Sequence, residues 1–435
     1  MLFRSGVHRN PFKLSLLNPA VVNTRTEVMP YHSWAANSIE LGGNTTLKND
    51  LMVDGSPIGV GHKATYTPNT DAVQEVNVVQ NSVDAEAGHS AGGIVSMTLK
   101  SGTNEWHGSA FFLGRNPVLN ALTDRTNNTK VAARNNMWGG TLGNPILKNR
   151  LFNFFSLEQW RPRDPLTQIR RMPTDLERNG NFTQTYGNTG VMKPIYDPTT
   201  TVFDAAANKA TRTPFAGNII PTSRIDPLSA KVMATLWGPN NPGDNITGAN
   251  NFKSAATRTT DYYNYTNRTD FTINDAWRVY GRVSRLHTMV DTMDWTPNQS
   301  LTFVPGDASA RHAFATSGDA VWTVNSNTVV NFHGDYHSLV DDYASPQYDL
   351  GSKLLEDLWP GNAWYSTYQT GLAEYFPRFL IGGSAFGRPG TYWNQHPNGW
   401  DFNGKVAQQR GSHYIKMGAD VRGNEIGRAS CRERV

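Results

Sequence analysis

The stretch VNFHGDYH, Val330–His337, decides the fold class of this chain. Successive side chains of a β-strand point to opposite faces, so the odd and even positions of this stretch would lie on different sides. One side would carry Val330, Phe332, Gly334 and Tyr336. The other would carry Asn331, His333, Asp335 and His337. The alternation predicts a β-strand with one largely apolar face and one polar face.

The same two-residue period recurs after about Ser101, in segments of about ten residues. Alternating apolar positions are found at Tyr263, Tyr265, Phe271 and Ile273, and again at Ile415, Met417, Ala419 and Val421. We count about nine candidate strands of this kind. A soluble β-sandwich alternates in the same way, so alternation alone leaves both a sandwich and a membrane barrel open.

Three further features favour a transmembrane barrel. The segments reach the roughly 9–11 residues that a tilted strand needs to cross a bilayer. Aromatic residues near strand ends suit the girdles at membrane interfaces: Trp160, Tyr262, Tyr263, Trp277 and Trp322. Tight turns at 274–275, 325–327 and 409–411 alternate along the chain with long connections at about 162–261, 289–311 and 341–400. Outer-membrane barrels have short turns on one side and long loops on the other, whereas soluble domains rarely carry such loops.

The composition excludes several other classes of protein. The 435 residues are 38% hydrophobic and 17% charged, and they contain no run of about 18 apolar residues, so a helical membrane protein is excluded. The aromatic content of 11% is too high for a disordered chain. The net charge of +4 is scattered rather than gathered in a basic run, so we expect no nucleic-acid partner.

Both ends of the chain differ from this strand pattern. Residues 1–100 mix short apolar runs and turns, such as Leu51–Gly55, and predict a small α+β module. At the other end, residues 426–435 resemble one reading frame of a common short-read sequencing adapter. We therefore expect residues 426–435, which include the only cysteine, Cys431, to be a sequencing artefact.

Several blocks of sequence resemble the TonB-dependent outer-membrane receptors, and within them the Oar-like subgroup. The densest block is DAVQEV, AGHSAGGIV and KSGTNEWHGSAF, within residues 71–111. Further blocks are NMWGGTLGNPI with KNRLFNFF (136–155), RNGNF with IYDP (178–198), and RTPFAGNIIP with RIDP (212–227). Together they span about 71–273 in the order found in that family.

The resemblance implies a fold and a function. It implies an all-β protein with an incomplete transmembrane antiparallel β-barrel and an N-terminal α+β plug remnant. Residues 1–100 would be a partial plug domain, and residues 101–425 would be the first part, about nine strands, of a barrel with long external loops. Nine is an odd count for a bacterial barrel. The family's signal peptide, TonB box and later strands are not seen, so we expect an internal fragment broken at both ends.

The same resemblance implies energised uptake, or export, of an unknown extracellular ligand through a plugged barrel. The expected partners are the lipid bilayer of a Gram-negative outer membrane and a TonB-type inner-membrane complex, which would act through the TonB box missing here. We expect no enzyme activity and no cofactor. The alternatives are a secreted or cell-surface β protein that binds glycans through aromatic-rich loops, and a glycan-cleaving enzyme with two carboxylates across a cleft.

Few residues suggest a chemical site. His333, Asp335 and His337 share one strand face at a spacing that could hold a metal, but a polar lumen face in contact with water explains them more simply. They are weak ligand-binding candidates, and we expect no catalytic, cofactor-binding or metal site. Asp341 and Asp342 are best explained as solvated loop acids.

Overall fold

The computed structural model describes residues 9–23, 29–30, 39–43, 48–60, 63–80, 90, 92–122, 132–292, 309–343, 379–381, 384–386 and 393–425. The segment that resembles an adapter, residues 426–435, lies outside the described residues.

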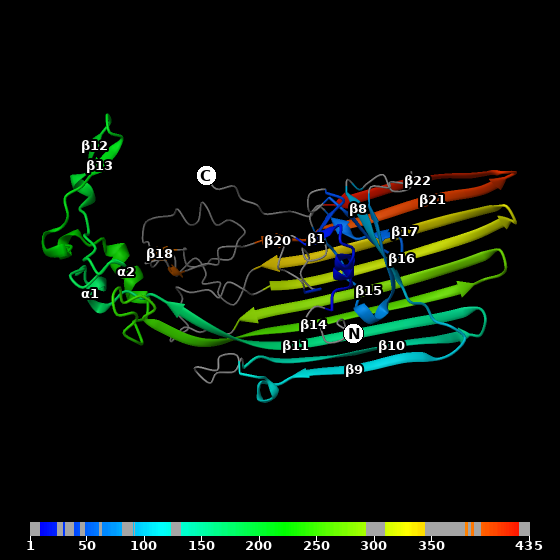
Figure 1. Cartoon of the computed structure of the whole chain (residues 1–435), viewed down its shortest axis with the longest axis horizontal. Helices are drawn as coiled ribbons and strands as arrows, with labels where there is room; N and C mark the ends of the chain where they lie inside the picture. Colours follow the sequence, from blue (N-terminus) through cyan, green and yellow to red (C-terminus); the bar gives the residue numbers. More distant parts are fainter. Residues whose placement is uncertain are drawn as a thin grey trace.

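One large antiparallel sheet, here called the wall, dominates the structure (Figure 1). Each strand pairs with the next wall strand along the chain, in the order β9 (His107–Arg115), β10 (Arg134–Leu147), β11 (Leu151–Arg170), β14 (Phe252–Thr272), β15 (Trp277–Thr292), β16 (Ser309–Asn325), β17 (Thr328–Tyr343), β21 (Asn398–Arg410) and β22 (His413–Glu425). A short strand, β20 (Trp393–Gln395), pairs with the end of β17. The expected all-β, antiparallel fold is confirmed. The described wall is a single sheet, and not the two-layer sandwich required by the glycan-binding alternative.

The wall strands are joined by tight turns at one end. The β14–β15 turn is organised by Asn274, whose Oδ1 accepts hydrogen bonds from the N–H groups of Ala276 (3.0 Å) and Trp277 (2.9 Å). In the β21–β22 turn, Gly411 has a φ of 60°, a left-handed conformation that glycine adopts without steric cost. The tight turns predicted from the sequence at these two places are confirmed.

At the other end, β11 and β14 are much longer than predicted. The sequence suggested a connection over about 162–261, but β11 continues to Arg170 and β14 begins at Phe252. Pro162 and Pro165 conceal the strand pattern in β11. Pro165 is tolerated because the part beyond Arg163 pairs only with β14, so its other edge needs no hydrogen-bond donors. Pro162 lies where the β11–β14 register is interrupted between Trp160 and Arg163.

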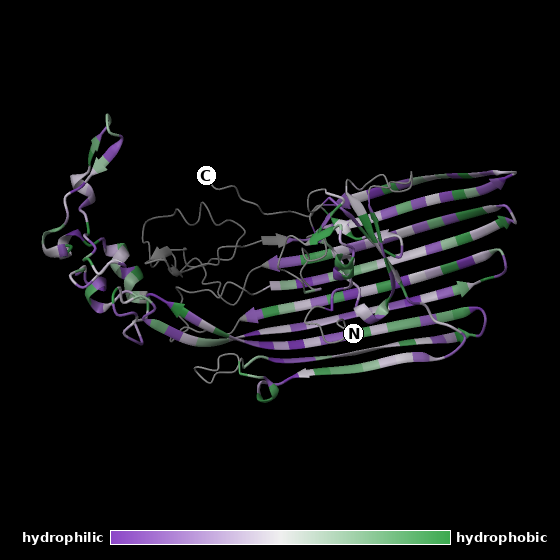
Figure 2. Cartoon of the chain, in the orientation of Figure 1, coloured by the Kyte–Doolittle hydropathy of each residue, from purple (hydrophilic) through white to green (hydrophobic). Residues whose placement is uncertain are grey.

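The two faces of the wall differ in polarity, as Figure 2 shows in the alternating colours of the strands. Outward-facing side chains include many exposed apolar residues: Phe112, Leu142, Leu157, Val283, Phe314, Phe332, Tyr336, Phe402 and Met417. Near the tight turns, Trp277 and Trp322 stack with ring centroids 5.3 Å apart, as expected of an interface girdle. Trp160 and Tyr262 were wrongly assigned to a girdle, because both face inward and are buried.

The described residues between 9 and 100, here called the N-terminal module, lie against the inner face of the wall (Figure 1). Their main sheet has the order β4-β3-β8-β7, with β3 (Asp50–Val53) parallel to β8 (Gly93–Leu99). The other two strands of this sheet are β4 (Ser56–Pro57) and β7 (Val73–Gln80). The remaining elements are η1 (Pro11–Leu17), β1 (Val21–Asn23), β2 (Ile39–Leu41), β5 (Gly59–Val60), β6 (Lys63–Ala64) and η2 (Thr70–Ala72). The buried core contains Phe12, Ile39, Leu51, Val53, Val95 and Met97, so the module packs around its own centre.

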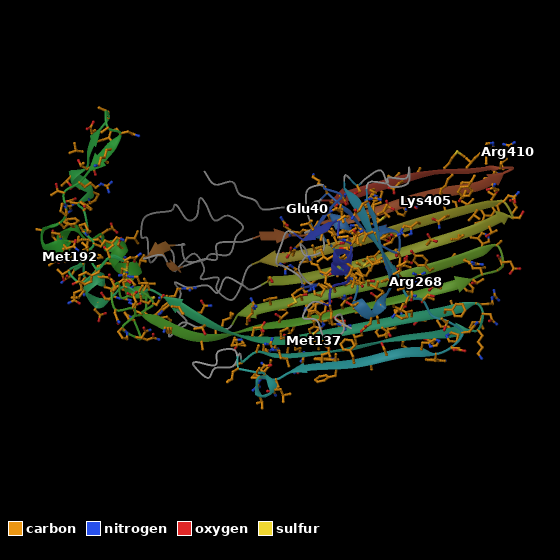
Figure 3. All side chains as sticks on the ribbon, viewed as in Figure 1. Glu40, Met137, Met192, Arg268, Lys405 and Arg410 are labelled. Carbon is orange, nitrogen blue, oxygen red and sulfur yellow. The ribbon has the colours of Figure 1, made fainter. Side chains whose placement is uncertain are left out.

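Residues 171–251, here called the insert, connect β11 to β14. The insert contains α1 (Asp175–Arg178), η5 (Pro198–Thr200), β12 (Val202–Asp204), β13 (Lys209–Thr211), η6 (Ala216–Asn218), η7 (Thr222–Arg224) and α2 (Pro227–Thr235). The Arg178 guanidinium joins the two α-helices by donating to the carbonyls of Met233 (2.8 Å) and Leu236 (2.9 Å). Figure 3 places Met192 of the insert and Arg410 of the β21–β22 turn at opposite ends of the molecule.

The other described elements are small. They are η4 (Pro117–Leu119) after β9, and the hairpin of β18 (Phe379–Ile381) and β19 (Ser384–Phe386). Within the described residues, none of the helices has the length and apolar character needed to cross a membrane.

The outward face of the wall predicts a specific response to a charged substitution. Phe332 is 51% exposed on that face. Phe332→Arg should lower the free energy of unfolding in lipid vesicles by about 2–4 kcal/mol, because arginine is costly on a lipid-facing strand. The measurement is reversible denaturant unfolding. The matched control is Phe203→Arg in the insert, where the side chain is already 62% exposed and we expect a change of no more than about 0.5 kcal/mol. Equal effects of the two substitutions would contradict a lipid-facing surface.

Candidate functional site

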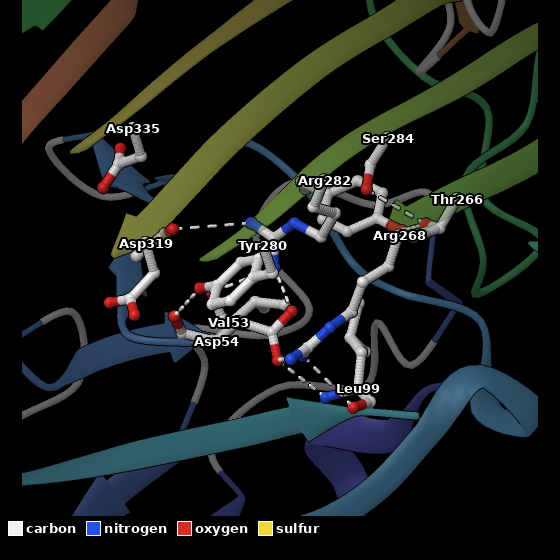
Figure 4. A network of polar contacts seen from close by, with 12 residues as sticks. Val53, Asp54, Leu99, Thr266, Arg268, Tyr280, Arg282, Ser284, Asp319 and Asp335 are labelled. Carbon is white, nitrogen blue, oxygen red and sulfur yellow. Dashed lines mark hydrogen bonds and ion pairs between the residues drawn. The ribbon is translucent and has the colours of Figure 1, made fainter. Parts of the chain in front are cut away.

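The N-terminal module contacts the wall at the β3–β4 turn. Asp54 and Gly55 occupy the two turn positions with φ values of 52° and 85°. This left-handed pair is the conformation that an Asp-Gly sequence favours in a two-residue hairpin. The strand-then-turn prediction for residues 51–55 is therefore confirmed, and the turn directs Asp54 toward the wall (Figure 4).

Asp54 is held between two arginines of the wall. One carboxylate oxygen is 3.0 Å from Nη1 of Arg268, and the other is 2.9 Å from Nη1 of Arg282. Arg282 also donates to the carbonyl oxygen of Val53 at 3.0 Å, and the Tyr280 hydroxyl donates to that of Asp54 at 2.8 Å. The Asp54 and Arg282 side chains are only 2% and 1% exposed. Each charge is thus compensated where water is excluded, and loss of one partner would leave the other buried and uncompensated.

Three further ion pairs connect the module to the wall. Lys63 contacts Asp341 at 2.5 Å, Arg9 contacts Glu158 at 2.8 Å, and Arg422 of the wall contacts Asp50 at 2.9 Å. Burial lowers the pKa of Lys63, although the Asp341 carboxylate acts in the opposite direction. Asp341 also pairs with Arg311 at 2.8 Å and is fully buried, so its assignment as a solvated loop acid was wrong.

Uncharged groups complete the interface. The Tyr66 hydroxyl of the module lies 2.5 Å from Oγ1 of Thr266 on β14. Tyr66 packs in one cluster with Trp160 and Tyr262, whose rings are 4.9 Å apart. Strand alternation directs Trp160 and Tyr262 inward, and the contact with Tyr66 explains why they are buried there.

The predicted candidates His333, Asp335 and His337 share the inner face of β17, as the alternation indicated. They are nevertheless buried rather than in contact with water, with exposures of 7%, 6% and 3%. The module covers this part of the wall, and the Ser56 hydroxyl lies 3.2 Å from Nε2 of His333. The structure adds Asp401 of β21, which the sequence did not single out because only strand register reveals its position opposite Asp335.

A separate pocket of about 380 Å³ lies in the insert, lined in part by Arg171, Glu177, Tyr186, Asp244 and Ile246. Burial alone would raise the pKa of Glu177, but hydrogen bonds from Thr174, Arg171 and Thr185 outweigh it, so the pKa is lowered. Hydrogen bonds from the Thr247 side chain and nearby backbone groups lower the pKa of Asp244 to about 2. Both carboxylates are thus held in the charged form at neutral pH.

Another ion pair stabilises the insert away from this pocket. The Arg224 guanidinium donates to both carboxylate oxygens of Asp197, at 2.8 and 3.0 Å. These hydrogen bonds, together with those from Thr199, hold the pKa of Asp197 well below its usual range.

Comparison with known proteins identifies the family. Residues 98–430 match the family described as "Outer membrane beta barrel domain". The TonB-dependent transporter Oar of Myxococcus xanthus is 31% identical over 125 residues, which are 27% of this chain and 12% of that protein. In fold, the chain is similar to the outer membrane transporter YddB of Escherichia coli, with a TM-score of 0.52 and 10% identity over 95% of this chain and 45% of that one.

The chain therefore spans about an eighth of the curated relative and less than half of the solved transporter. The named relatives are transporters and not enzymes, in agreement with the expectation of no enzyme activity. The expected barrel class and outer-membrane location are confirmed by the family match. The chain belongs to the outer membrane beta-barrel family and is a bacterial outer-membrane protein, and 27% of it is similar to a TonB-dependent transporter.

Proposed function

We propose that this chain takes part in energised transport of an extracellular ligand through a barrel that is closed by a plug. Residues 1–100 would act as the plug and residues 101–425 as the first part of the barrel. A TonB-type inner-membrane complex would drive movement of the plug, as the name of the Oar relative suggests for that protein. Uptake is the proposed direction, and export is the alternative.

One observation carries this proposal: the N-terminal module is fastened to the wall mainly by polar groups, while its apolar core is its own. Of the buried residues in that core, only Phe154 comes from the wall. The charged contacts of this interface are the pairs that Asp54, Lys63, Arg9 and Asp50 make with wall residues, and Tyr66 adds an apolar contact. Such charges recover hydration when water enters, so the module can separate from the wall without exposing its own core.

The insert is the proposed ligand-facing part, because it lies at the end of the wall opposite the tight turns. Outer-membrane barrels present their long loops to the exterior. The insert exposes aromatic and apolar side chains beside amides and hydroxyls: Tyr186, Met192, Tyr196, Val202, Phe203 and Ile246. Surfaces of this composition can stack on a ligand and form hydrogen bonds with it.

Energised plug movement can be tested with a buried reporter cysteine. Thr67 of the module is 3% exposed, and its carbonyl accepts a hydrogen bond from the Asn264 side chain of the wall. In a chain that carries Cys431→Ser and a TonB box placed upstream of residue 1, Thr67→Cys should react with a small hydrophilic maleimide several-fold faster in energised cells that contain the TonB-type complex. An uncoupler, or deletion of the complex, should abolish the increase. Mass spectrometry of labelled peptides gives the measurement.

The control for this labelling is Val202→Cys, which lies on an exposed insert strand and should react at one rate in all cells. A Thr67→Cys rate that ignores both the uncoupler and the complex would contradict energised movement of the module.

The fastening of the module predicts a second result. Asp54→Asn should leave Arg268 and Arg282 poorly compensated, at a cost of about 3 kcal/mol. Hydrogen exchange of backbone amides in residues 50–57 should then quicken by roughly 100-fold through local opening. Glu75→Gln on the exposed β7 position is the control and should change the rate little. Unchanged protection in Asp54→Asn would show that the ion pairs do not hold the module.

The insert predicts a defined pH response. Folding lowers the pKa values of Glu177, Asp197 and Asp244. Their contribution to the stability of the insert is therefore complete above the pKa values of the unfolded chain, which are near 4. It is lost as the pH falls through the folded values, which is about 2 for Asp244. Hydrogen exchange corrected for intrinsic rates should show the insert intact at pH 5 and opening between about pH 4 and 2.

Asp244→Asn gives the comparison for this pH response. This substitution should open the insert partly at pH 7, because the hydrogen bonds from Thr247 and Ala249 lose their charged acceptor. It should also weaken the pH dependence of hydrogen exchange in the insert below pH 4. Opening of the unaltered insert above pH 5 would be inconsistent with these lowered pKa values.

A further inference from the structure

Three potential metal ligands converge on the inner face of the wall, beneath the N-terminal module. Asp335 of β17 and Asp401 of β21 lie directly opposite each other in the strand register. His333 precedes Asp335 by two residues and therefore shares its face. One ligand atom from each of the three side chains lies within 4.8 Å of the other two, and all three residues are buried.

The position of these groups is electrostatically unfavourable as it stands. Two carboxylates directly opposite on neighbouring strands repel each other, and burial strengthens that repulsion. Arg422 lies 3.2 Å from Asp401, but it also contacts Asp50 at 2.9 Å and Asp420 at 3.2 Å. The Arg422 guanidinium thus forms ion pairs with three carboxylates. His333 is similarly divided between Asp319 and Asp335, each at 3.5 Å.

Unsatisfied atoms point to the same conclusion. Within the described part of the chain, Oδ2 of Asp335 and Oδ2 of Asp401 accept no well-aligned hydrogen bond, although the two residues are 94% and 100% buried. The charged contacts of these two oxygens are Nε2 of His333 at 3.5 Å and Nε of Arg422 at 3.2 Å, and Arg422 is shared with Asp50 and Asp420. Oδ2 of Asp335 is the oxygen that lies 3.5 Å from Nε2 of His333, so it is directed into the cluster. Buried carboxylate oxygens with so few donors are costly, and a further cation between them would compensate both.

We propose that a divalent transition-metal cation binds at this place, with His333, Asp335 and Asp401 as its protein ligands. One imidazole nitrogen with carboxylate oxygens suits Zn²⁺ and its neighbours, whereas Ca²⁺ prefers oxygen ligands alone. Ligand atoms of a tetrahedral zinc site lie about 3.4 Å apart, so the side chains would close in by roughly 1 Å. Sequence alone gave no metal site here, because Asp401 is 66 residues from Asp335 and joins it only through strand pairing.

The cation would also connect the module to the wall. Ser56 of the β3–β4 hairpin places its hydroxyl 3.2 Å from Nε2 of His333, next to the cation position. A cation on Nε2 would take the lone pair that the Ser56 hydroxyl now faces, which leaves that hydroxyl within reach as a ligand from the module. Binding of the cation would therefore favour the seated position of the hairpin over the displaced one. At a free concentration 100 times the Kd, this linkage should slow exchange of the amides in residues 50–57 by up to about 100-fold.

The test uses the full chain extracted from outer membranes in detergent and dialysed against ZnCl₂. Inductively coupled plasma mass spectrometry should find one more zinc per chain in the unaltered protein than in Asp335→Asn/Asp401→Asn. Asp342→Asn is the matched control, since it removes a carboxylate from the same strand but from the outward face. Zinc bound at the outward pair His287 and His312 contributes equally to all samples and cancels from the difference.

Two measurements on the unaltered chain cover the case in which the double variant does not fold. Co²⁺ in place of zinc should give visible absorption bands of a four-coordinate site with nitrogen and oxygen ligands. Zinc should also slow hydrogen exchange in residues 50–57. Equal zinc content in the unaltered chain and in a folded double variant would overturn the proposal. The absence of both the cobalt bands and the zinc-dependent protection would overturn it as well.

Discussion

The pairing of every wall strand with its chain neighbour is the constraint on which the rest of this structure depends. A backbone group exposed to lipid has no water to bind, so each strand must satisfy its N–H and C=O groups laterally. The order β9 to β22 does this with tight turns at one end and long connections at the other. Once that pairing is set, side chains alternate between two different solvents, and the position of each residue along its strand decides which solvent it meets.

The inner face follows from the same constraint. Because alternate residues point inward, the wall presents polar and charged side chains such as Arg268, Arg282 and Asp341. A partner that covers this face must bring matching charges, and the N-terminal module does so with Asp54 and Lys63. The geometry of this interface is fixed by paired charges, whereas a protein core is held together by continuous apolar contacts. A continuous apolar interface of the same extent would raise the free energy needed to separate the module from the wall, because its apolar surface would become exposed to water.

Much of the wall could be predicted from sequence because its signals are local. The alternation at 330–337, the Asp-Gly turn at 54–55 and the tight turns at 274 and 411 depend on residues that are adjacent in the chain. The burial of Trp160 and Tyr262 was missed because it depends on Tyr66, which lies almost a hundred residues or more away. Likewise, the burial of His333 depends on Ser56, and the role of Asp341 depends on Lys63. These contacts are set by how the module seats on the wall, which no local pattern contains.

The two longest strands have a consequence for how a ligand would approach. β11 and β14 contain 20 and 21 residues, about twice what a bilayer crossing needs. At about 3.3 Å per residue, the surplus of roughly ten residues forms a twisted ribbon about 30 Å long. The insert lies at the tip of this ribbon, and in the proposed orientation it would stand clear of the lipid headgroups. First contact with a ligand and its passage would then take place at separate positions, and molecules too bulky to enter a pore could still contact the protein at the insert.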